Sequence, residues 1–446
     1  MRVREGIGIV LLLLGLLRAT LLVMQDPLAG YGDQYDTHRT ASCLGLAPDV
    51  PAADGGKLHG PYPLYRSERT VKVECYPSTE VAFGAAVLAA TGALHVEGKG
   101  IRLQWFGLGK LALLFITAIL IAWTFHDHPA ASIAHGAVML LVLSDPVVTL
   151  WFNTLSTEFF VVWSIYAIIA SACALAISDR GAIVMWSLLT LSVIALAFSR
   201  EQFALLGPVL VAFSAPWLWY RSGPVTGVIF FMAALSAAVA FTVMHPRPPP
   251  PDAPPASATF AIPRALPAEP EVFARTAAKA MAAVQPVSVD APAREANDKA
   301  RVRDLPWWAF SPIDAGISRV HPAIFPLFLF VTFLLAPITM LMALAWARPA
   351  SANVGASLLY AILLGTVVLY AYVTAVFGER PAQAARAFLP GQLAMYALWV
   401  SLLAGVPFLA LRWYAAPNWK EMALGVVAIA LLVAGCIYAM PWIDAS

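Results

Sequence analysis

The sequence predicts an all-α integral membrane protein with about eleven transmembrane helices. Of its 446 residues, 60% are hydrophobic and only 12% are charged, whereas soluble domains carry about 25% charged residues. The apolar residues are gathered in runs of about 17–25, which is typical of membrane-spanning helices and not of barrel strands, whose residues alternate. The apolar runs make a lipid bilayer the expected surroundings. The net charge of +2 argues against a nucleic-acid partner.

The first predicted span covers residues 6–24 and follows Arg2 and Arg4. A cleaved signal peptide also begins with basic residues and an apolar run. This run is long for one, however, and no small-residue cleavage site follows it, so we expect a retained span. Arg18 lies in the outer part of the run, where its long side chain can reach the interface or hold a phosphate.

A polar loop is predicted over residues 25–106. Within it, residues 81–94 are apolar but only about 14 residues long, which favours a helix lying in the interface over a span. Residues 99–106 are predicted to form a second interfacial segment. Cys43 and Cys75 both lie in this loop, and a disulfide between them is expected if the loop faces an oxidising compartment.

The remaining spans fall into two groups. The first group comprises residues 107–125, 131–144, 159–177, 182–198, 203–220 and 225–244, and the second comprises residues 323–347, 354–377, 390–411 and 422–441. The residues between the groups are rich in proline and read as a stiff polyproline stretch at their start. The chain therefore divides into residues 1–244, a Pro-rich loop over residues 245–322, and C-terminal transmembrane helices over residues 323–446.

The basic residues of the short loops predict the orientation. With the N-terminus in the cytoplasm, the inner connections hold Arg180, Arg221, Arg348, Arg412 and Lys420. Cytoplasmic loops carry such an excess of Lys and Arg. Both long loops then lie on the outer side of the membrane. Counting residues 81–94 as a span would place these basic residues outside, so the charge rule also favours the interfacial helix.

Polar and ionisable residues of the loops gather on the predicted outer side. Residues 30–39 (GYGDQYDTHR) place Asp33 and Asp36 directly after the first span. The other candidates are Arg39, Asp145, Asn153, Glu158, Arg200, Glu201, Gln202, Arg380 and Arg386. A carboxylate can deprotonate a hydroxyl group, and guanidinium groups bind phosphate. Two simpler interpretations stay open: Asp145 ends a helix before Pro146, and Arg386 pairs with Glu379.

The sequence indicates no cofactor. His126 and His128 have a spacing found in metal sites, but they lie alone on the predicted inner side, so no metal ligand is assigned. His135 is expected to be a packing residue of a span.

The first outer loop, with its acidic motif followed by interfacial segments, resembles that of the GT-C superfamily of multi-spanning glycosyltransferases. Residues 151–158 (WFNTLSTE) are similar to the Tyr-Phe-Asn-Ser-Phe-Tyr-Ser-Glu type of motif in some bacterial members. Residues 199–202 (SREQ) occupy the place of a short basic or polar loop in such proteins. The resemblance covers residues 1–220, and the Pro-rich loop matches no pattern of the family.

The resemblance implies an inverting transfer of a sugar from a polyprenyl-phosphate carrier to a glycan, a lipid-linked glycan or another cell-envelope acceptor. Residues 1–244 would then be the catalytic half, in a bacterial inner membrane with the active site on the periplasmic side. The family's catalytic base corresponds to Asp33 or Asp36. Asp33 is favoured because Gly30 and Gly32 allow a tight turn before it, and Asp36 has Arg39 as an ion-pair partner. Arg200, Arg380 or Arg386 would stabilise the leaving phosphate.

Two other functions are considered. An O-antigen ligase or polymerase would use its late outer loop, where Arg319 and His321 are the candidates. A lipid or solute transporter would place charged groups near the membrane midplane, commonly with internal repeats. The sequence has no evident repeat, and its charges gather on one side, which argues against transport.

Overall fold

The computed structural model describes residues 3–26, 28–30, 34–49, 62–67, 75, 77–94, 96, 98–244, 309, 311, 352–375, 387–401 and 404. The predicted spans at residues 323–347 and 422–441 lie outside the described residues. So does the Pro-rich loop, residues 309 and 311 excepted. The predicted total of about eleven spans is therefore not tested.

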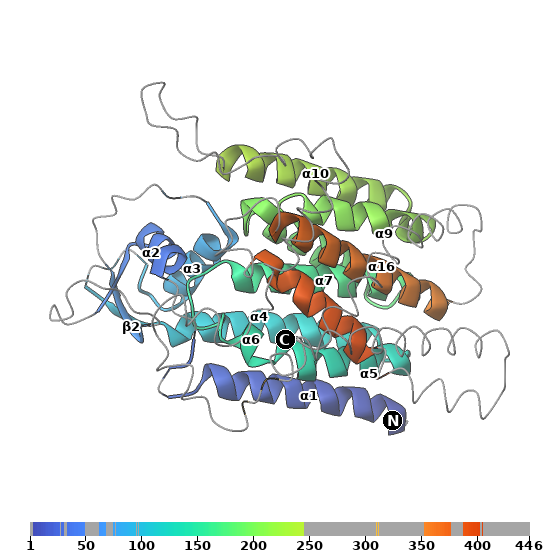
Figure 1. Ribbon diagram of the computed structural model, residues 1–446, viewed down its shortest axis with the longest axis horizontal. Coiled ribbons are helices and arrows are strands. Elements are labelled where there is room, and N and C mark those ends of the chain that lie inside the picture. Colours follow the sequence, from blue (N-terminus) through green and yellow to red (C-terminus); the bar gives the residue numbers. More distant parts are fainter. Residues whose placement is uncertain are drawn as a thin grey trace, which may run out of the picture.

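Long apolar helices run side by side as a bundle (Figure 1). They are α1 (Val3–Val23), α4 (Gln104–Thr124), α5 (Pro129–Val138), α7 (Glu158–Ile177), α8 (Ala182–Ala197), α9 (Leu206–Ser222), α10 (Pro224–Met244) and α16 (Ala352–Val373). A π-helical turn, η2 (Met139–Leu143), continues α5, and residues 387–401 are also helical. Within the described part of the chain, six helices are long and apolar enough to cross a membrane. The protein is therefore membrane-embedded, as the sequence predicts.

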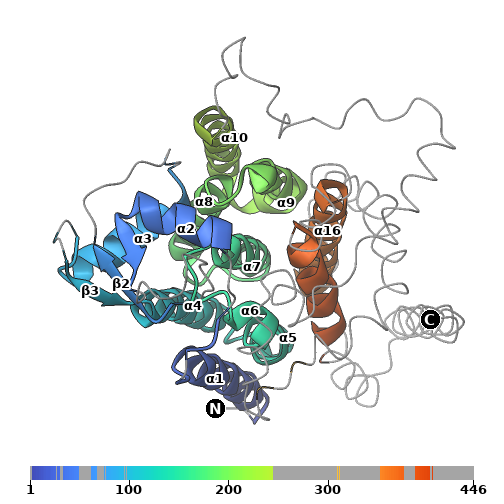
Figure 2. The ribbon, with the colours of Figure 1, turned by 60° about the vertical axis from the view of Figure 1, so that its left-hand side comes forward.

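Helix α7 lies at the centre of the bundle (Figure 2) and packs against α4, α8, α9 and α16. Most of its side chains are buried, and Trp163 Nε1 donates a hydrogen bond of 3.0 Å to Thr117 Oγ1 of α4. Helix α10 is different, because Val228 and Phe231 on its outward side are about 60% exposed. Large apolar side chains exposed on a membrane-embedded bundle are suited to contact with lipid.

Helix α1 is an integral part of the bundle. It packs on α5 and η2, and Leu12, Leu16 and Ala19 are buried there. The helices approach closely, since a Cβ atom added at Gly15 would lie 2.8 Å from the backbone nitrogen of Leu140. Small residues permit such close packing of membrane helices. Helix α1 is therefore packed against the bundle along its length, and its retention in the mature protein stays a prediction.

The first loop folds into a small unit at one end of the bundle. It contains α2 (Gln34–Cys43), α3 (Thr79–Ala90) and a three-stranded antiparallel sheet in the order β1 (Leu46–Pro48), β2 (Leu64–Ser67), β3 (Gly100–Arg102). We call this end of the bundle the loop end. Tyr65 and Ile101 pair across the sheet and are buried in one apolar cluster with Leu155, from the connection before α7. The unit is therefore packed onto the bundle.

The predicted interfacial helix at residues 81–94 corresponds to α3. The second predicted interfacial segment, at residues 99–106, contains β3 and the first turn of α4, and its place at the interface stays a prediction. The sheet was not predicted. Its strands have only three or four residues, too few for an alternating pattern to be recognised.

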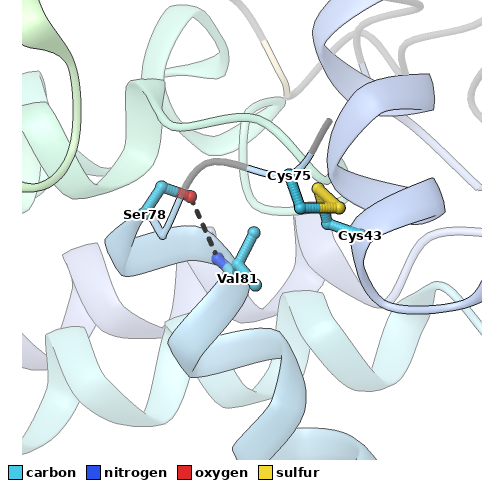
Figure 3. The surroundings of a disulfide bond; sticks show 4 residues. All are labelled: Cys43, Cys75, Ser78 and Val81. Carbon is cyan, nitrogen blue, oxygen red and sulfur yellow. Dashed lines mark hydrogen bonds between the residues drawn. A yellow bond between two sulfur atoms is a disulfide. The ribbon is translucent and has the colours of Figure 1, made fainter. Parts of the chain in front are cut away.

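The predicted disulfide between Cys43 and Cys75 is confirmed, with the two Cα atoms 5.3 Å apart (Figure 3). It joins the last residue of α2 to the segment that leads into α3. Ser78 caps α3, and its Oγ accepts a hydrogen bond of 3.3 Å from the backbone nitrogen of Val81. The disulfide and the cap together fix where α3 begins relative to α2.

The opposite end of the bundle carries short connections. Arg180, between α7 and α8, lies 3.2 Å from Asp127, between α4 and α5. A hydrogen bond from His126, with the Arg180 charge as a further cause, holds the pKa of Asp127 below its usual range. These connections lie at one end, and Asn153, Glu158 and Arg200, which the sequence assigns to the outer side, lie at the other.

Candidate functional site at the loop end

The acidic motif begins at a buried residue of the loop end. Ala29 and Gly30 are buried, and α2 begins four residues later at Gln34. Asp33 lies outside the described residues, and so do Arg380 and Arg386. Asp36 lies in α2, but its side chain is not described. Arg39 lies in the same helix and is partly buried.

Asn153 is fully buried and holds the chain that precedes the acidic motif. Its Nδ2 donates a hydrogen bond of 3.1 Å to the carbonyl oxygen of Val23 and one of 2.8 Å to that of Ala29. Val23 is the last residue of α1. One side chain of the WFNTLSTE motif therefore joins the end of the first span to the start of residues 30–39.

The environment of Asn153 is tight. Gly107 of α4 faces its amide oxygen so closely that a Cβ atom at position 107 would overlap Asn153 Oδ1. Within the described ranges of the chain, Oδ1 has no hydrogen-bond partner. The position of the amide is thus set by its two donated hydrogen bonds and by the contact with the α4 backbone.

Glu158 and Arg200 form an ion pair. Arg200 Nη1 lies 3.4 Å from Glu158 Oε1, and the two side chains are 15% and 3% exposed. Glu158 begins α7, and Arg200 lies in the connection between α8 and α9. The sequence predicted both as site residues, and the fold brings them together.

Glu80 and Lys110 form a second ion pair, which lies between α3 and α4. Lys110 Nζ lies 2.8 Å from Glu80 Oε1 and donates a hydrogen bond of 2.7 Å to the carbonyl oxygen of Thr154. Both side chains are fully buried. Burial raises the pKa of Glu80 to about 7, although the ammonium group of Lys110 opposes the rise. The charge of Glu158 also acts on Glu80, so the two pairs belong to one buried group of four charges.

Asp145 is fully buried at the start of a short helix, α6 (Pro146–Thr149). Its Oδ1 accepts a hydrogen bond of 2.9 Å from the backbone nitrogen of Val147 and one of 2.7 Å from Ser311 Oγ. Asp145 therefore caps the start of α6. Through Ser311, a residue of the second predicted loop is attached to the same end of the bundle.

Arg18 is bound beside this cap. Its Nη1 donates a hydrogen bond of 3.2 Å to the carbonyl oxygen of Leu140, within the π-helical turn η2. Ser144 Oγ donates to the same oxygen at 2.6 Å. Turns of this kind free a backbone carbonyl from the helix ladder and are frequent at functional sites.

Glu201 and Gln202 belong to the short helix η3 (Glu201–Phe203), next to Arg200. The carbonyl oxygen of Gln202 accepts a hydrogen bond of 2.8 Å from Tyr370 Oη, near the end of α16. The C-terminal helices therefore contact the loop end next to Arg200.

The sequence reasoning missed Glu80 and Lys110. The signal was present, because a lysine inside an apolar span marks a polar partner or a functional site. The partner was not identifiable, since α3 is separated from α4 by β3 and only the fold brings Glu80 under Lys110. Among the described residues, no group of three or more His, Cys, Asp or Glu side chains lies close enough to hold a metal ion.

No protein-family model, no curated protein and no solved structure matches this chain.

Proposed function

We propose that the protein is an inverting glycosyltransferase that takes its sugar from a polyprenyl-phosphate carrier. The acceptor is a glycan, a lipid-linked glycan or another cell-envelope molecule, and the reaction takes place at the loop end, on the periplasmic side of a bacterial inner membrane. The observation that carries the proposal is the pair of hydrogen bonds from Asn153 to Val23 and Ala29. They attach the acidic motif to the connection that ends in Glu158, beside Arg200.

The arrangement supports this chemistry in two ways. The acidic motif lies where a membrane span meets the loop end, so a water-soluble acceptor and a lipid-anchored donor can meet there. Arg200 supplies a positive charge at the same end. Among the described contacts, Glu158 engages only Nη1 of Arg200, so the other N–H groups of the guanidinium can face a phosphate. An arginine can bind phosphate with two parallel hydrogen bonds.

In the proposed mechanism, Asp33 or Asp36 accepts the proton of the acceptor hydroxyl group. The hydroxyl oxygen attacks the anomeric carbon as the bond from that carbon to the phosphate oxygen breaks. Polyprenyl phosphate leaves with the electron pair of that bond as an anion, and Arg200 stabilises the negative charge. Arg380 and Arg386 are further candidates for this role.

The first test is transfer by variants of the acidic motif. The purified protein, reconstituted in liposomes, is incubated with a panel of polyprenyl-phosphate-linked sugars and cell-envelope acceptors. Asp33→Asn and Asp36→Asn are compared with the unchanged protein at matched amounts. Loss of a general base lowers the rate by about 10²–10⁴, so one of the two variants should lose most of its transfer activity.

Two results would contradict the proposal. If both variants transfer sugar at the native rate, the acidic motif is not the active site. If the unchanged protein consumes no donor but moves an intact lipid or solute across the liposome membrane, it is a transporter.

A further inference from the structure

We infer that Asn153 is a positioning residue for the acidic motif and that Gly107 supplies the space it needs. The inference rests on the proposed function for its catalytic meaning, but the physical claim concerns the placement of residues 30–39. Asn153 acts through the backbone that it holds and is not assigned contact with a substrate.

The two hydrogen bonds from Asn153 join the end of a helix to the chain that follows it. Val23 ends α1 and Ala29 comes directly before Gly30. Helix α1 leaves its last carbonyl groups without partners in the helix, and Asn153 donates to one of them. The same amide donates to Ala29, so it fixes the segment between these two residues against the end of the helix.

Further contacts hold the anchor itself. Leu155, two residues after Asn153, is buried in the apolar cluster under the sheet. Thr154 accepts the hydrogen bond from Lys110 through its carbonyl oxygen. The connection that carries Asn153 is thus held by the packing of Leu155 and by the hydrogen bond to the Thr154 backbone. A residue that positions a catalytic group must itself be held in this way.

Gly107 is the second, independent observation. Any larger residue at position 107 would overlap Asn153 Oδ1, so the added methyl group must move the amide or the helix. Since the buried amide is hydrogen-bonded to the carbonyl oxygens of Val23 and Ala29, its displacement should shift these two residues. A substitution on α4 should therefore displace the acidic motif without touching it.

The test is a double-mutant cycle of Gly107→Ala and Asn153→Ala. Gly107→Ala should lower kcat by about a hundredfold, the effect of a misplacement of about 1 Å, while the KM for the donor changes little. Asn153→Ala should lower kcat by a similar factor because both hydrogen bonds are lost. In the double variant the methyl group at 107 has no amide to displace and keeps only its 3.2 Å contact with Val23 Cγ1. Its effect should therefore be much smaller than in the single variant, which makes the two substitutions non-additive.

Hydrogen exchange of the peptides covering residues 24–43 provides a readout that does not depend on activity. Both single variants should exchange at least about tenfold faster there than the unchanged protein, which corresponds to about 1.4 kcal/mol of lost protection. The matched control is Gly109→Ala, which adds the same methyl group to α4. That group meets the far end of the Phe83 ring at 2.8 Å, and its nearest atoms belong to Phe83 and Val87 and not to Asn153.

The outcomes separate the two proposals. Additive effects in the cycle, or unchanged exchange over residues 24–43 in both single variants, would overturn the positioning role. If exchange rises as expected but the unchanged protein transfers no sugar, the positioning role stands and the glycosyltransferase proposal fails.

Discussion

At the scale of single residues, the ion pair of Arg200 decides how that side chain can act. Glu158 lies 3.4 Å away, a longer distance than the 2.7–2.9 Å of a tight charge-assisted hydrogen bond. The pair holds the guanidinium group at the loop end without engaging it fully. In the proposed reaction, another edge of the group would bind the donor phosphate while Glu158 keeps the side chain oriented.

We expect Arg200→Ala to weaken use of the phosphate-linked donor by about ten- to a hundredfold in kcat/KM, since a hydrogen bond to a charged group is worth about 1.5–3 kcal/mol. Arg200→Lys keeps the charge but loses the two-pronged geometry, so its loss should be smaller. Steady-state kinetics with donor as the varied substrate measures both. Unchanged donor kinetics in Arg200→Ala would leave Arg200 as the structural partner of Glu158 alone.

At the scale of secondary-structure elements, α3 is held at both its start and its buried side. The backbone nitrogen of Thr79 donates to the carbonyl oxygen of Phe198 at 2.9 Å, and its Oγ1 donates to that of Ala195 at 2.7 Å, both at the end of α8. Glu80 is the next residue and pairs with Lys110 of α4. Consecutive residues therefore attach one short helix to two different helices of the bundle.

Because Glu80 and Lys110 are a buried ion pair, we expect single substitutions to destabilise the protein much more than the double substitution. Glu80→Gln or Lys110→Met should each lower the free energy of unfolding by about 3–5 kcal/mol, because each leaves a buried charge without its counter-charge. The double variant should recover much of this loss, since two neutral side chains carry no desolvation cost of charge. Thermal unfolding in one detergent, followed by tryptophan fluorescence, compares the four proteins. Equal losses in single and double variants would show that the charges do not interact.

At the scale of the whole molecule, the parts predicted from the sequence are those set by local composition. The apolar runs predicted α1, α4, α7 and α10 because burial in lipid depends on the run itself. The pairing of Cys43 with Cys75 was predictable because the first loop holds only these two cysteines. The roles of Arg18 and Asn153 were not predictable, because each side chain donates to a carbonyl oxygen of a distant segment. The hydrogen bond from Ser311 to Asp145 likewise joins residues far apart in the sequence.

The arrangement of the two ends predicts which sites share a side of the membrane. Single cysteines at Gly55 in the first loop and at Ala258 in the second loop should react with an impermeant maleimide from the same side. A cysteine at Asp179, beside the Asp127–Arg180 pair, should react only from the opposite side. Labelling of right-side-out and inverted vesicles tests all three. Gly55 and Ala258 on opposite sides would overturn the predicted topology.

The buried charges also bear on how the chain enters the membrane. Synthesis proceeds from the N-terminus, so Glu80 emerges before Lys110, and Glu158 emerges before Arg200. In each ion pair the acid is therefore already available when its base arrives. Lys110 would be costly for α4 to insert alone, but the helix that carries its partner has by then been made. The order of the charges along the chain is thus suited to stepwise insertion, with each new cation neutralised by a carboxylate made earlier.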